Sequence, residues 1–176
     1  IHLDHGSTLF DVTRAIRNGY TSVMIDASTQ SFEDNISITK QIVELAHNVD
    51  VSVEAELGTI GNNGSTEGGT DEIIYTDPDQ ADYFVKETNI DTLAVAIGTS
   101  HGLYPKGKKP ELNIELLKEI NSRLSIPIVL HGGSGNPNEE VRESVLYGVG
   151  KVNLSSDLKS VFFEQVRQTL IDNKNM

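Results

Sequence analysis

Three histidines stand at places in the sequence where their side chains could share a metal ion. His5, His101 and His131 each end or follow a short apolar run of the kind that predicts a β-strand. Three imidazole ligands hold zinc and leave its fourth tetrahedral position open for a substrate. A lone histidine at such a place would more often be a packed or surface side chain. Three of the chain's five histidines at one end of the predicted strands favour a metal site, whereas His2 and His47 are expected to be packed or surface residues.

Acidic side chains accompany these histidines at the same strand ends. Asp4 directly precedes His5, Asp26 ends the second apolar run, and Glu56 lies near the end of the third. The chain contains no cysteine, which excludes a disulfide framework, a thiolate metal site and a cysteine nucleophile. The candidate ligands are therefore imidazole nitrogens and carboxylate oxygens.

Glycine and hydroxyl residues follow the last two predicted strands. Gly132-Gly133-Ser134-Gly135 comes directly after His131, and Asn153-Leu154-Ser155-Ser156 precedes a predicted helix. Backbone N–H groups of a glycine-rich loop and of a helix N-terminus bind anions, so these two segments predict a phosphate site. A β-branched residue in place of Gly133 is expected to weaken anion binding with little loss of stability.

The residues that could do chemistry are separated by a regular alternation of apolar and amphipathic stretches. The predicted strands are Ile1–Asp4, Ser22–Asp26, Val51–Leu57, Thr92–Gly98, Pro127–His131 and Lys151–Leu154. The predicted helices are Thr8–Asn18, Phe32–Asn48, Asp79–Thr88, Ile114–Leu124, Asn138–Tyr147 and Asp157–Ile171. Such alternation predicts an α/β fold with parallel strands. It leaves open both a doubly wound sheet and an eight-stranded β/α barrel.

The polarity of the strand faces favours the barrel. In the third predicted strand Ala55 and Leu57 share one face, and Glu54 and Glu56 share the other. A strand covered by helices on both faces should be apolar on both, whereas a barrel can place polar side chains in its interior. Because a complete (β/α)8 TIM barrel has eight strands, residues 1–176 are predicted to be a single partial barrel domain containing strands three to eight, without the first two strand–helix units.

The composition restricts the partners of the protein. The chain of 176 residues has 14 Lys and Arg against 26 Asp and Glu, a formal charge of -12. Nucleic-acid binding rests on cationic side chains that neutralise phosphates, so the acidic balance argues against it but not against a small phosphorylated ligand. We see neither a signal peptide nor an apolar run near the ~18 residues of a membrane span. A cytoplasmic protein without a membrane partner is expected.

At these motifs the sequence resembles the class II, zinc-dependent ketose-bisphosphate aldolases, which include fructose- and tagatose-bisphosphate aldolases. The similar segments occur in family order over nearly the whole chain: 2–5, 22–26, 53–58, 94–102 and 130–135. The resemblance implies an eight-stranded β/α barrel and a lyase of carbohydrate metabolism. It implies reversible cleavage of a ketohexose 1,6-bisphosphate into dihydroxyacetone phosphate and glyceraldehyde 3-phosphate through a zinc-stabilised enediolate.

The resemblance also implies a role for each matching residue. His5, His101 and His131 would be the zinc ligands, and Asp4 the acid that protonates the aldehyde oxygen. Asp26 and Glu56 would hold metal in a second or alternative position. The dihydroxyacetone phosphate site would comprise Gly102, Gly132, Gly133, Ser134, Asn153, Ser155 and Ser156.

A glycine-rich segment, Gly58–Thr70, is predicted to form a lid over this site. It contains Glu67, the candidate base that removes a proton from the substrate carbon. The family resemblance further implies a monovalent cation near the phosphate site and a homo-oligomer, either a dimer or a tetramer.

Three alternatives to a zinc aldolase remain open at this point. A Schiff-base aldolase needs a lysine that faces the barrel interior, but Lys151 is predicted to begin its strand, and the other predicted strands contain none. A metal-dependent hydrolase of the same fold and a non-catalytic sugar-phosphate-binding barrel are the other two. Among aldolases, Asn153-Leu154-Ser155-Ser156-Asp157 lacks the first acid of the fructose-type Asn-x-Asp-Thr-Asp pattern, which favours the tagatose type.

Overall fold

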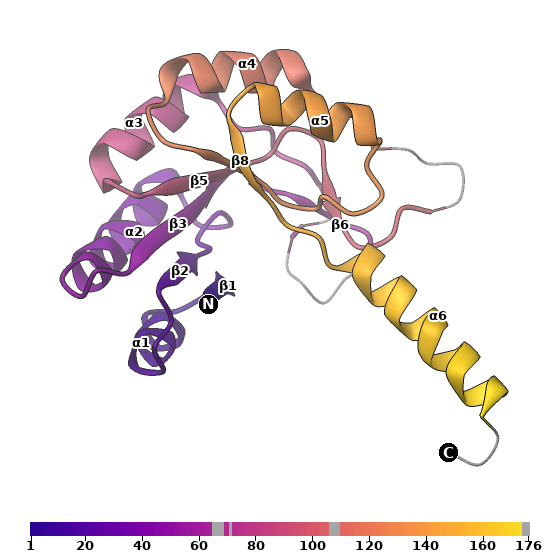
Figure 1. Ribbon diagram of the computed structural model, residues 1–176. Helices are drawn as coiled ribbons and strands as arrows, with labels where there is room; N and C mark the ends of the chain where they lie inside the picture. The colour runs from indigo at the N-terminus through magenta and orange to yellow at the C-terminus, as the bar shows by residue number, and fades with distance from the viewer. Residues whose placement is uncertain (65–68, 71, 106–109, 174–176) are drawn as a thin grey trace.

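A computed structural model describes residues 1–64, 69–70, 72–105 and 110–173. Its main sheet contains six parallel strands in the spatial order β1-β2-β3-β5-β7-β8. These are β1 (His2–Gly6), β2 (Ser22–Ile25), β3 (Ser52–Leu57), β5 (Thr92–Val95), β7 (Ile128–Leu130) and β8 (Val149–Val152). Because spatial order follows chain order and the sheet curves, the chain forms part of a β/α barrel (Figure 1).

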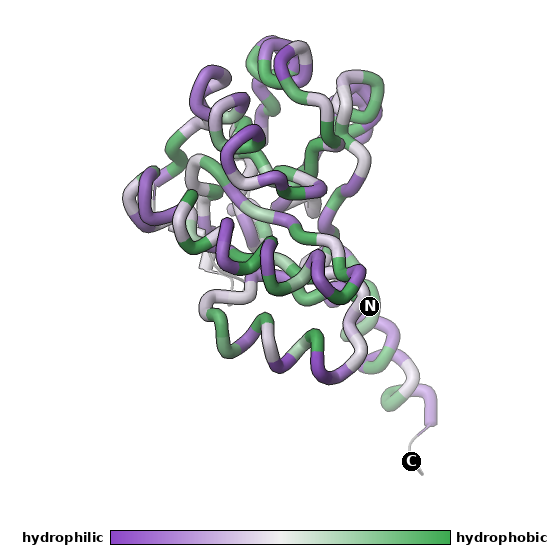
Figure 2. Tube along the Cα trace, turned by 90° about the vertical axis from the view of Figure 1, so that its left-hand side faces the viewer, coloured by the Kyte–Doolittle hydropathy of each residue, from purple (hydrophilic) through white to green (hydrophobic). Residues whose placement is uncertain are grey.

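Helices return the chain from the end of one strand to the start of the next. They are α1 (Leu9–Arg17), α2 (Phe32–His47), α3 (Pro78–Thr88), α4 (Ile114–Arg123), α5 (Asn138–Leu146) and α6 (Ser156–Asp172). The first five lie along the outer side of the curved sheet (Figure 1). Apolar and polar segments alternate along the helices (Figure 2), as expected of helices that bury one face against a sheet.

The two faces of the sheet differ as the sequence predicts. Ala55 and Leu57 belong to the main core, where outward-facing strand residues pack with helix residues such as Phe84. The opposite, inner face carries the buried carboxylates Glu54 and Glu56. This distribution confirms the prediction of a barrel fragment with a polar interior.

A second, two-stranded parallel sheet lies outside the predicted elements. Strand β4 (Gly61–Asn62) pairs with β6 (Ser100–His101). Asn62 is the partner of His101 in this pairing, so His101 is held by a short sheet beyond the end of β5. Sequence periodicity did not predict strands of two residues because so short a run has no detectable alternation.

The boundaries of the last strand also differ from the prediction. Strand β8 begins at Val149 and ends at Val152, two residues earlier than expected. Lys151 is therefore inside the strand and not at its beginning. The shift leaves Lys151 on the same face of the sheet, because side chains alternate with a period of two, but it moves the lysine from the beginning of the strand toward its carboxyl end.

Helix α6 projects away from the rest of the molecule (Figure 1). None of its residues is buried, and the apolar side chains of Leu158, Val161 and Phe162 are more than half exposed. Strands β1 and β8 form the two edges of the six-stranded sheet. Among the helices of the described residues, none has both the length and the apolar character needed to cross a bilayer.

Candidate metal centre

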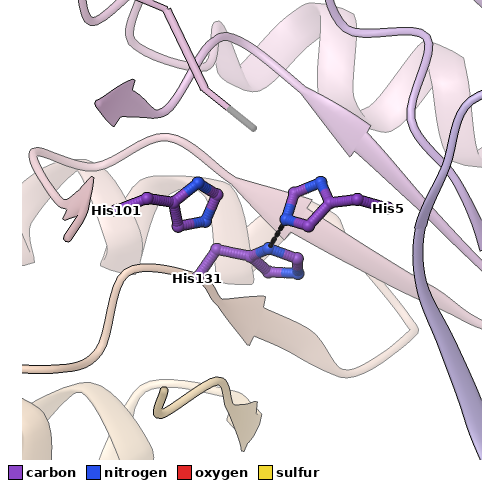
Figure 3. A group of neighbouring side chains, drawn as sticks. All are labelled: His5, His101 and His131. Carbon is purple, nitrogen blue, oxygen red and sulfur yellow. Dashed lines mark hydrogen bonds between the residues drawn. The ribbon is translucent and has the colours of Figure 1, made fainter. Parts of the chain in front are cut away.

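The three predicted histidines meet in space (Figure 3). His5 comes from β1, His101 from β6, and His131 directly follows β7. Ring nitrogens of all three lie within 4.8 Å of one another, and the ring centroids are 4.7 to 5.8 Å apart. This spacing lets the three imidazoles converge on one ion.

An irregular strand end directs His5 into the cluster. His5 has a φ of 47°, a left-handed value that costs a non-glycine residue free energy. The β1–β2 register shifts between Leu3 and Gly6, and such bulges change the direction of a side chain. At Gly6 a Cβ atom would lie 2.6 Å from the carbonyl oxygen of Met24, so glycine permits the close approach of the two strands.

Two of the histidines have their outer ring nitrogens bound to carboxylates. His5 Nδ1 lies 2.8 Å from Asp26 Oδ2, and His131 Nε2 lies 2.8 Å from Glu54 Oε1. An ionised carboxylate only accepts hydrogen bonds, so each of these nitrogens carries the proton. The remaining nitrogens, His5 Nε2 and His131 Nδ1, lie 3.0 Å apart, at hydrogen-bonding distance. Burial alone would lower the pKa of His5, but its hydrogen bond to Asp26 and the charge of Glu56 raise it, so the proton between the two rings belongs to His5 Nε2 and the lone pair to His131 Nδ1. Such a pair is stable when a proton or a metal cation is shared between them.

The carboxylates of this region differ strongly in their affinity for protons. Burial alone would raise the pKa of Asp26, but hydrogen bonds from His5 and Ser28 lower it to about 2. Burial would likewise raise the pKa of Glu54, but the hydrogen bond from His131 and the positive charge of Lys151 lower it to about 2. Both groups are therefore negatively charged at neutral pH.

Glu56 behaves in the opposite way. Its burial, together with the charge of Asp26, raises the pKa of Glu56 to about 8. Among the described residues Glu56 Oε2 has no hydrogen-bond partner, and it lies 4.0 Å from His131 Nδ1. A buried oxygen without a partner is costly, so this atom is available to a cation beside the histidines. The imidazoles and this carboxylate are a donor set that fits zinc.

A second group of possible ligands already has a cationic side chain within it. Ligand atoms of His2, Asp4 and Glu54 approach within 4.8 Å of one another. The ammonium of Lys151 donates to Glu54 Oε2 at 2.6 Å and lies 3.2 Å from His2 Nε2. Burial and Lys151 lower the pKa of His2, which makes the neutral ring an acceptor for this ammonium. Lys151 thus already supplies a positive charge to Glu54 and His2 of this group.

The position of Lys151 corrects the expectation drawn from its predicted strand end. Its side chain points into the interior and is one-third exposed. Because β8 starts two residues earlier than predicted, Lys151 lies near the carboxyl end of the strand, beside Val129 of β7, and its ammonium reaches Glu54 of β3. Sequence analysis gave neither Lys151 nor Glu54 a role in the site, although Glu54 shares the inner face with Glu56.

A cavity opens beside the histidines. It is lined by most of the predicted site residues together with Val152 and Leu154; the predicted ones are Asp4, His5, His101, Gly102, Gly132, Ser134, Asn153, Ser155 and Ser156. The Ser134 hydroxyl oxygen accepts from the backbone N–H groups of Ser155 and Asp157, each at 3.2 Å. The two loops predicted to bind phosphate are therefore joined to each other and form one wall of the cavity.

Gly133 has a packing role in this wall and does not line the cavity. Its N–H donates to the carbonyl oxygen of Asn153 at 3.0 Å. An added Cβ would lie 2.5 Å from Val152 Cγ1 and 2.8 Å from the Asn153 oxygen. The expectation that Gly133 can be replaced with little loss of stability is wrong, because a larger residue would force the two loops apart.

Of the other predicted site residues, the structure describes the carboxylates on the strands but not the candidate base. Asp4 is exposed to the cavity, and its Oδ1 accepts a hydrogen bond from Asn153 Nδ2 at 3.1 Å. Asp26 and Glu56 each have a ligand atom within 4.8 Å of one on His5, so they form a group that could hold a metal ion. The candidate base Glu67 lies outside the described residues.

The curved parallel sheet with a histidine cluster at the carboxyl ends of its strands defines a β/α-barrel protein with a candidate metal centre. A family model described as "Fructose-bisphosphate aldolase class-II" matches residues 1–176. The chain belongs to this class II aldolase family.

Known relatives agree with this assignment and exceed the chain in length. A fructose-bisphosphate aldolase of Staphylococcus epidermidis is 43% identical over 176 residues, which are 100% of this chain and 60% of the relative. The D-tagatose-1,6-bisphosphate aldolase subunit GatY of Klebsiella oxytoca is 42% identical over 98% of this chain and 61% of its own. The crystal structure of the YdjI aldolase from Escherichia coli K12 has a TM-score of 0.81 and 36% identity, covering 99% of this chain and 59% of that one. The chain thus spans about three-fifths of the length of these relatives.

Proposed function

We propose that the protein containing this chain is a zinc-dependent aldolase that reversibly cleaves a ketohexose 1,6-bisphosphate into dihydroxyacetone phosphate and glyceraldehyde 3-phosphate. Family membership supports the reaction class. The observation that carries the metal dependence is the convergence of two inner ring nitrogens, His5 Nε2 and His131 Nδ1, which lie 3.0 Å apart while the outer nitrogens of both rings bind carboxylates. A metal cation that replaces the shared proton would have both nitrogens, and His101 beside them, as ligands.

Each part of the proposed mechanism has its own support in the cavity. Zinc, when bound by the three histidines, supplies a Lewis acid that polarises the substrate carbonyl. We assign to Asp4 the transfer of a proton at the aldehyde oxygen, because it lines the cavity and its Oδ1 is held by Asn153. We assign to the Gly132–Ser134 and Asn153–Ser156 loops the binding of the substrate phosphate, which fixes the approach of the reacting carbons.

The base that removes the carbon-bound proton completes the proposal. We assign this step to Glu67, on the family resemblance of the glycine-rich segment that contains it. Loss of a general base lowers the rate by about 10²–10⁴-fold. Glu67→Ala should therefore lower kcat by that factor without changing the metal content of the protein.

The names of the relatives suggest two candidate substrates, the bisphosphates of fructose and of tagatose. The absence of the first acid in the Asn153–Asp157 segment favours the tagatose bisphosphate. We also propose a monovalent cation near the phosphate site and a cytoplasmic homo-oligomer, both from the family resemblance.

One experiment tests the reaction and its metal together. The intact protein is assayed for cleavage of both bisphosphates, first as purified, then after treatment with a chelator, and then after zinc is added back. We expect cleavage to disappear with the chelator and to return with zinc. The Asp4→Asn variant should retain zinc but lose activity by about 10²–10⁴-fold. Cleavage that persists without metal, together with a covalent enzyme–substrate adduct after borohydride treatment, would instead identify a Schiff-base aldolase.

A further inference from the structure

The described residues include a network of polar side chains, most of them buried, that the proposed reaction does not use directly. It runs from Lys151 on β8 through Glu54 on β3 to His131 after β7. Glu54 is 2% exposed and His131 is fully buried. Burying a charged group costs free energy unless the group is paired and hydrogen-bonded. Each of these side chains therefore depends on its neighbours in the network.

We propose that Lys151 and Glu54 are positioning residues that fix the tautomer and the orientation of His131, so that its Nδ1 faces the metal position. This inference rests on the proposed function, because it takes the three-histidine cluster as the metal centre. Glu54 Oε1 accepts from His131 Nε2 at 2.8 Å, and Glu54 Oε2 accepts from the Lys151 ammonium at 2.6 Å. The two carboxylate oxygens thus have separate partners, one on each side.

The tautomer follows from the chemistry of the partners. A carboxylate cannot donate, so His131 Nε2 must carry the proton that lies between the two groups. His131 Nδ1 is then left with its lone pair directed at His5 Nε2, toward the cluster. Partners of this kind on the far nitrogen fix the orientation of metal-binding histidines and increase their basicity.

One neighbouring contact competes with this assignment. Asn153 Nδ2 lies 3.1 Å from the same His131 Nε2, and an amide N–H could donate there only if that nitrogen were bare. The shorter contact to a charged carboxylate outweighs it. The amide has another acceptor, Asp4 Oδ1 at 3.1 Å, so its N–H group is satisfied without His131.

Lys151 is the group that prevents Glu54 from turning away. The other contacts of Glu54 Oε2 are weaker, since Thr92 Oγ1 lies 3.4 Å and His2 Nε2 lies 3.9 Å away. His2 is in turn held by Ser22, whose Oγ is 2.8 Å from His2 Nδ1. The Lys151 ammonium therefore lies between two acceptors, His2 Nε2 and Glu54 Oε2. It holds Glu54 Oε2 in place while Glu54 Oε1 accepts from His131.

The first measurement is spectroscopic and needs no metal. Long-range ¹⁵N–¹H spectra of the intact, chelator-treated protein should show His131 protonated at Nε2 and bare at Nδ1. In Lys151→Met the two tautomers should become mixed, whereas Lys151→Arg should retain the wild-type form because it keeps the charge and the donors. A wild-type His131 that is bare at Nε2 would overturn the proposal.

The second measurement is zinc affinity, determined by competition with a chelating dye. Loss of an outer partner of a metal ligand typically weakens binding by about 10–100-fold, so we expect Glu54→Gln to fall in that range and Lys151→Met to weaken binding by about tenfold. If Lys151 acts through Glu54, the double variant should bind no more weakly than Glu54→Gln alone. Lys40→Met, which breaks the exposed ion pair with Glu87, is the matched control and should change affinity less than about twofold.

The two readouts separate the inference from the proposed function. A wild-type protein that shows the expected tautomer but binds no zinc would refute the metal centre while leaving the positioning of His131 intact. Unchanged zinc affinity and an unchanged His131 tautomer in folded Lys151→Met would refute the role of Lys151. If that variant does not fold, the spectrum of Lys151→Arg and the affinity of Glu54→Gln still decide the question, because full-strength binding in Glu54→Gln contradicts the proposal.

Discussion

Among single residues, Glu56 shows most directly how burial sets chemistry in this protein. It is 2% exposed, lies near Asp26, and leaves Oε2 without a hydrogen-bond partner among the described residues. Burial and the Asp26 charge raise its pKa from 4.5 to about 8. In the metal-free protein Glu56 is therefore protonated at neutral pH, and ionised Glu56 requires a cation beside it.

This pKa predicts a pH-dependent effect of Glu56→Gln. Between about pH 4.5 and 8 Glu56 ionises in the unfolded chain but keeps its proton in the folded protein, so wild-type stability falls as pH rises through this window. Glutamine does not titrate, and the variant escapes this loss. In chelated protein we expect the variant to be more stable at pH 8 by several kcal/mol, because each unit of pKa shift is worth about 1.4 kcal/mol, with little difference near pH 4.

Urea unfolding at a series of pH values measures this difference. Glu164→Gln on the exposed helix α6 removes the same charge without burial and is the control. A stability difference that stays constant with pH would show that Glu56 is already charged in the folded, metal-free protein.

At the scale of elements, the wall of the cavity depends on how closely the loop after β7 approaches the loop after β8. Gly133 donates its N–H to Asn153, and Ser134 accepts from Ser155 and Asp157. These bonds hold the start of α6 against the glycine-rich loop. The two segments act as one unit because the chain at Gly133 has no side chain to separate them.

Gly133→Ala should therefore reduce stability as well as substrate binding. Its Cβ would lie 2.5 Å from Val152 Cγ1, whereas a Cβ at Gly150 in β8 would lie 3.1 Å from Pro127 Cβ. Overpacking of this kind costs about 1–3 kcal/mol. Thermal unfolding should show a clear decrease in Tm for Gly133→Ala and a much smaller one for Gly150→Ala. Equal Tm values for the two variants would mean that the loops separate without cost.

At the scale of the whole molecule, the described chain leaves surfaces that a complete barrel would cover. The edge strands β1 and β8 each have one side without a strand partner among the described residues, and exposed edges pair readily with other strands. The apolar residues of α6 are exposed as well. We propose that two further strand–helix units, about 80 residues at ~30–40 each, join the two edges and pack on α6.

Residues 1–176 produced alone should therefore associate or bind a hydrophobic dye, whereas the protein with the further units should not. Replacing Phe162, which is 61% exposed, with lysine should reduce dye binding by the isolated segment, while Lys159→Gln on the same helix should not. Light scattering and dye fluorescence measure both effects. An isolated segment that is monomeric, cooperatively folded and active would contradict this proposal.

The sequence by itself determined the elements and most of the candidate site. Apolar runs fixed the six main strands because each must bury its outer face under a helix, as Ala55 and Leu57 do. The carboxyl ends of parallel strands meet at one edge of a sheet, so His5 and His131 could be placed together without knowledge of any distance. The family resemblance rested on the same positions.

Only the tertiary structure decided how His131 is held. Lys151 and Glu54 are 97 positions apart in the chain and meet across the barrel interior because the sheet curves. A two-residue error in the start of β8 was enough to hide this contact, since local periodicity does not fix strand ends. The bulge at His5 and the short β4–β6 pairing at His101 were hidden for the same reason. Patterns along the chain specify which face a residue occupies, but curvature and register between distant strands determine what it touches.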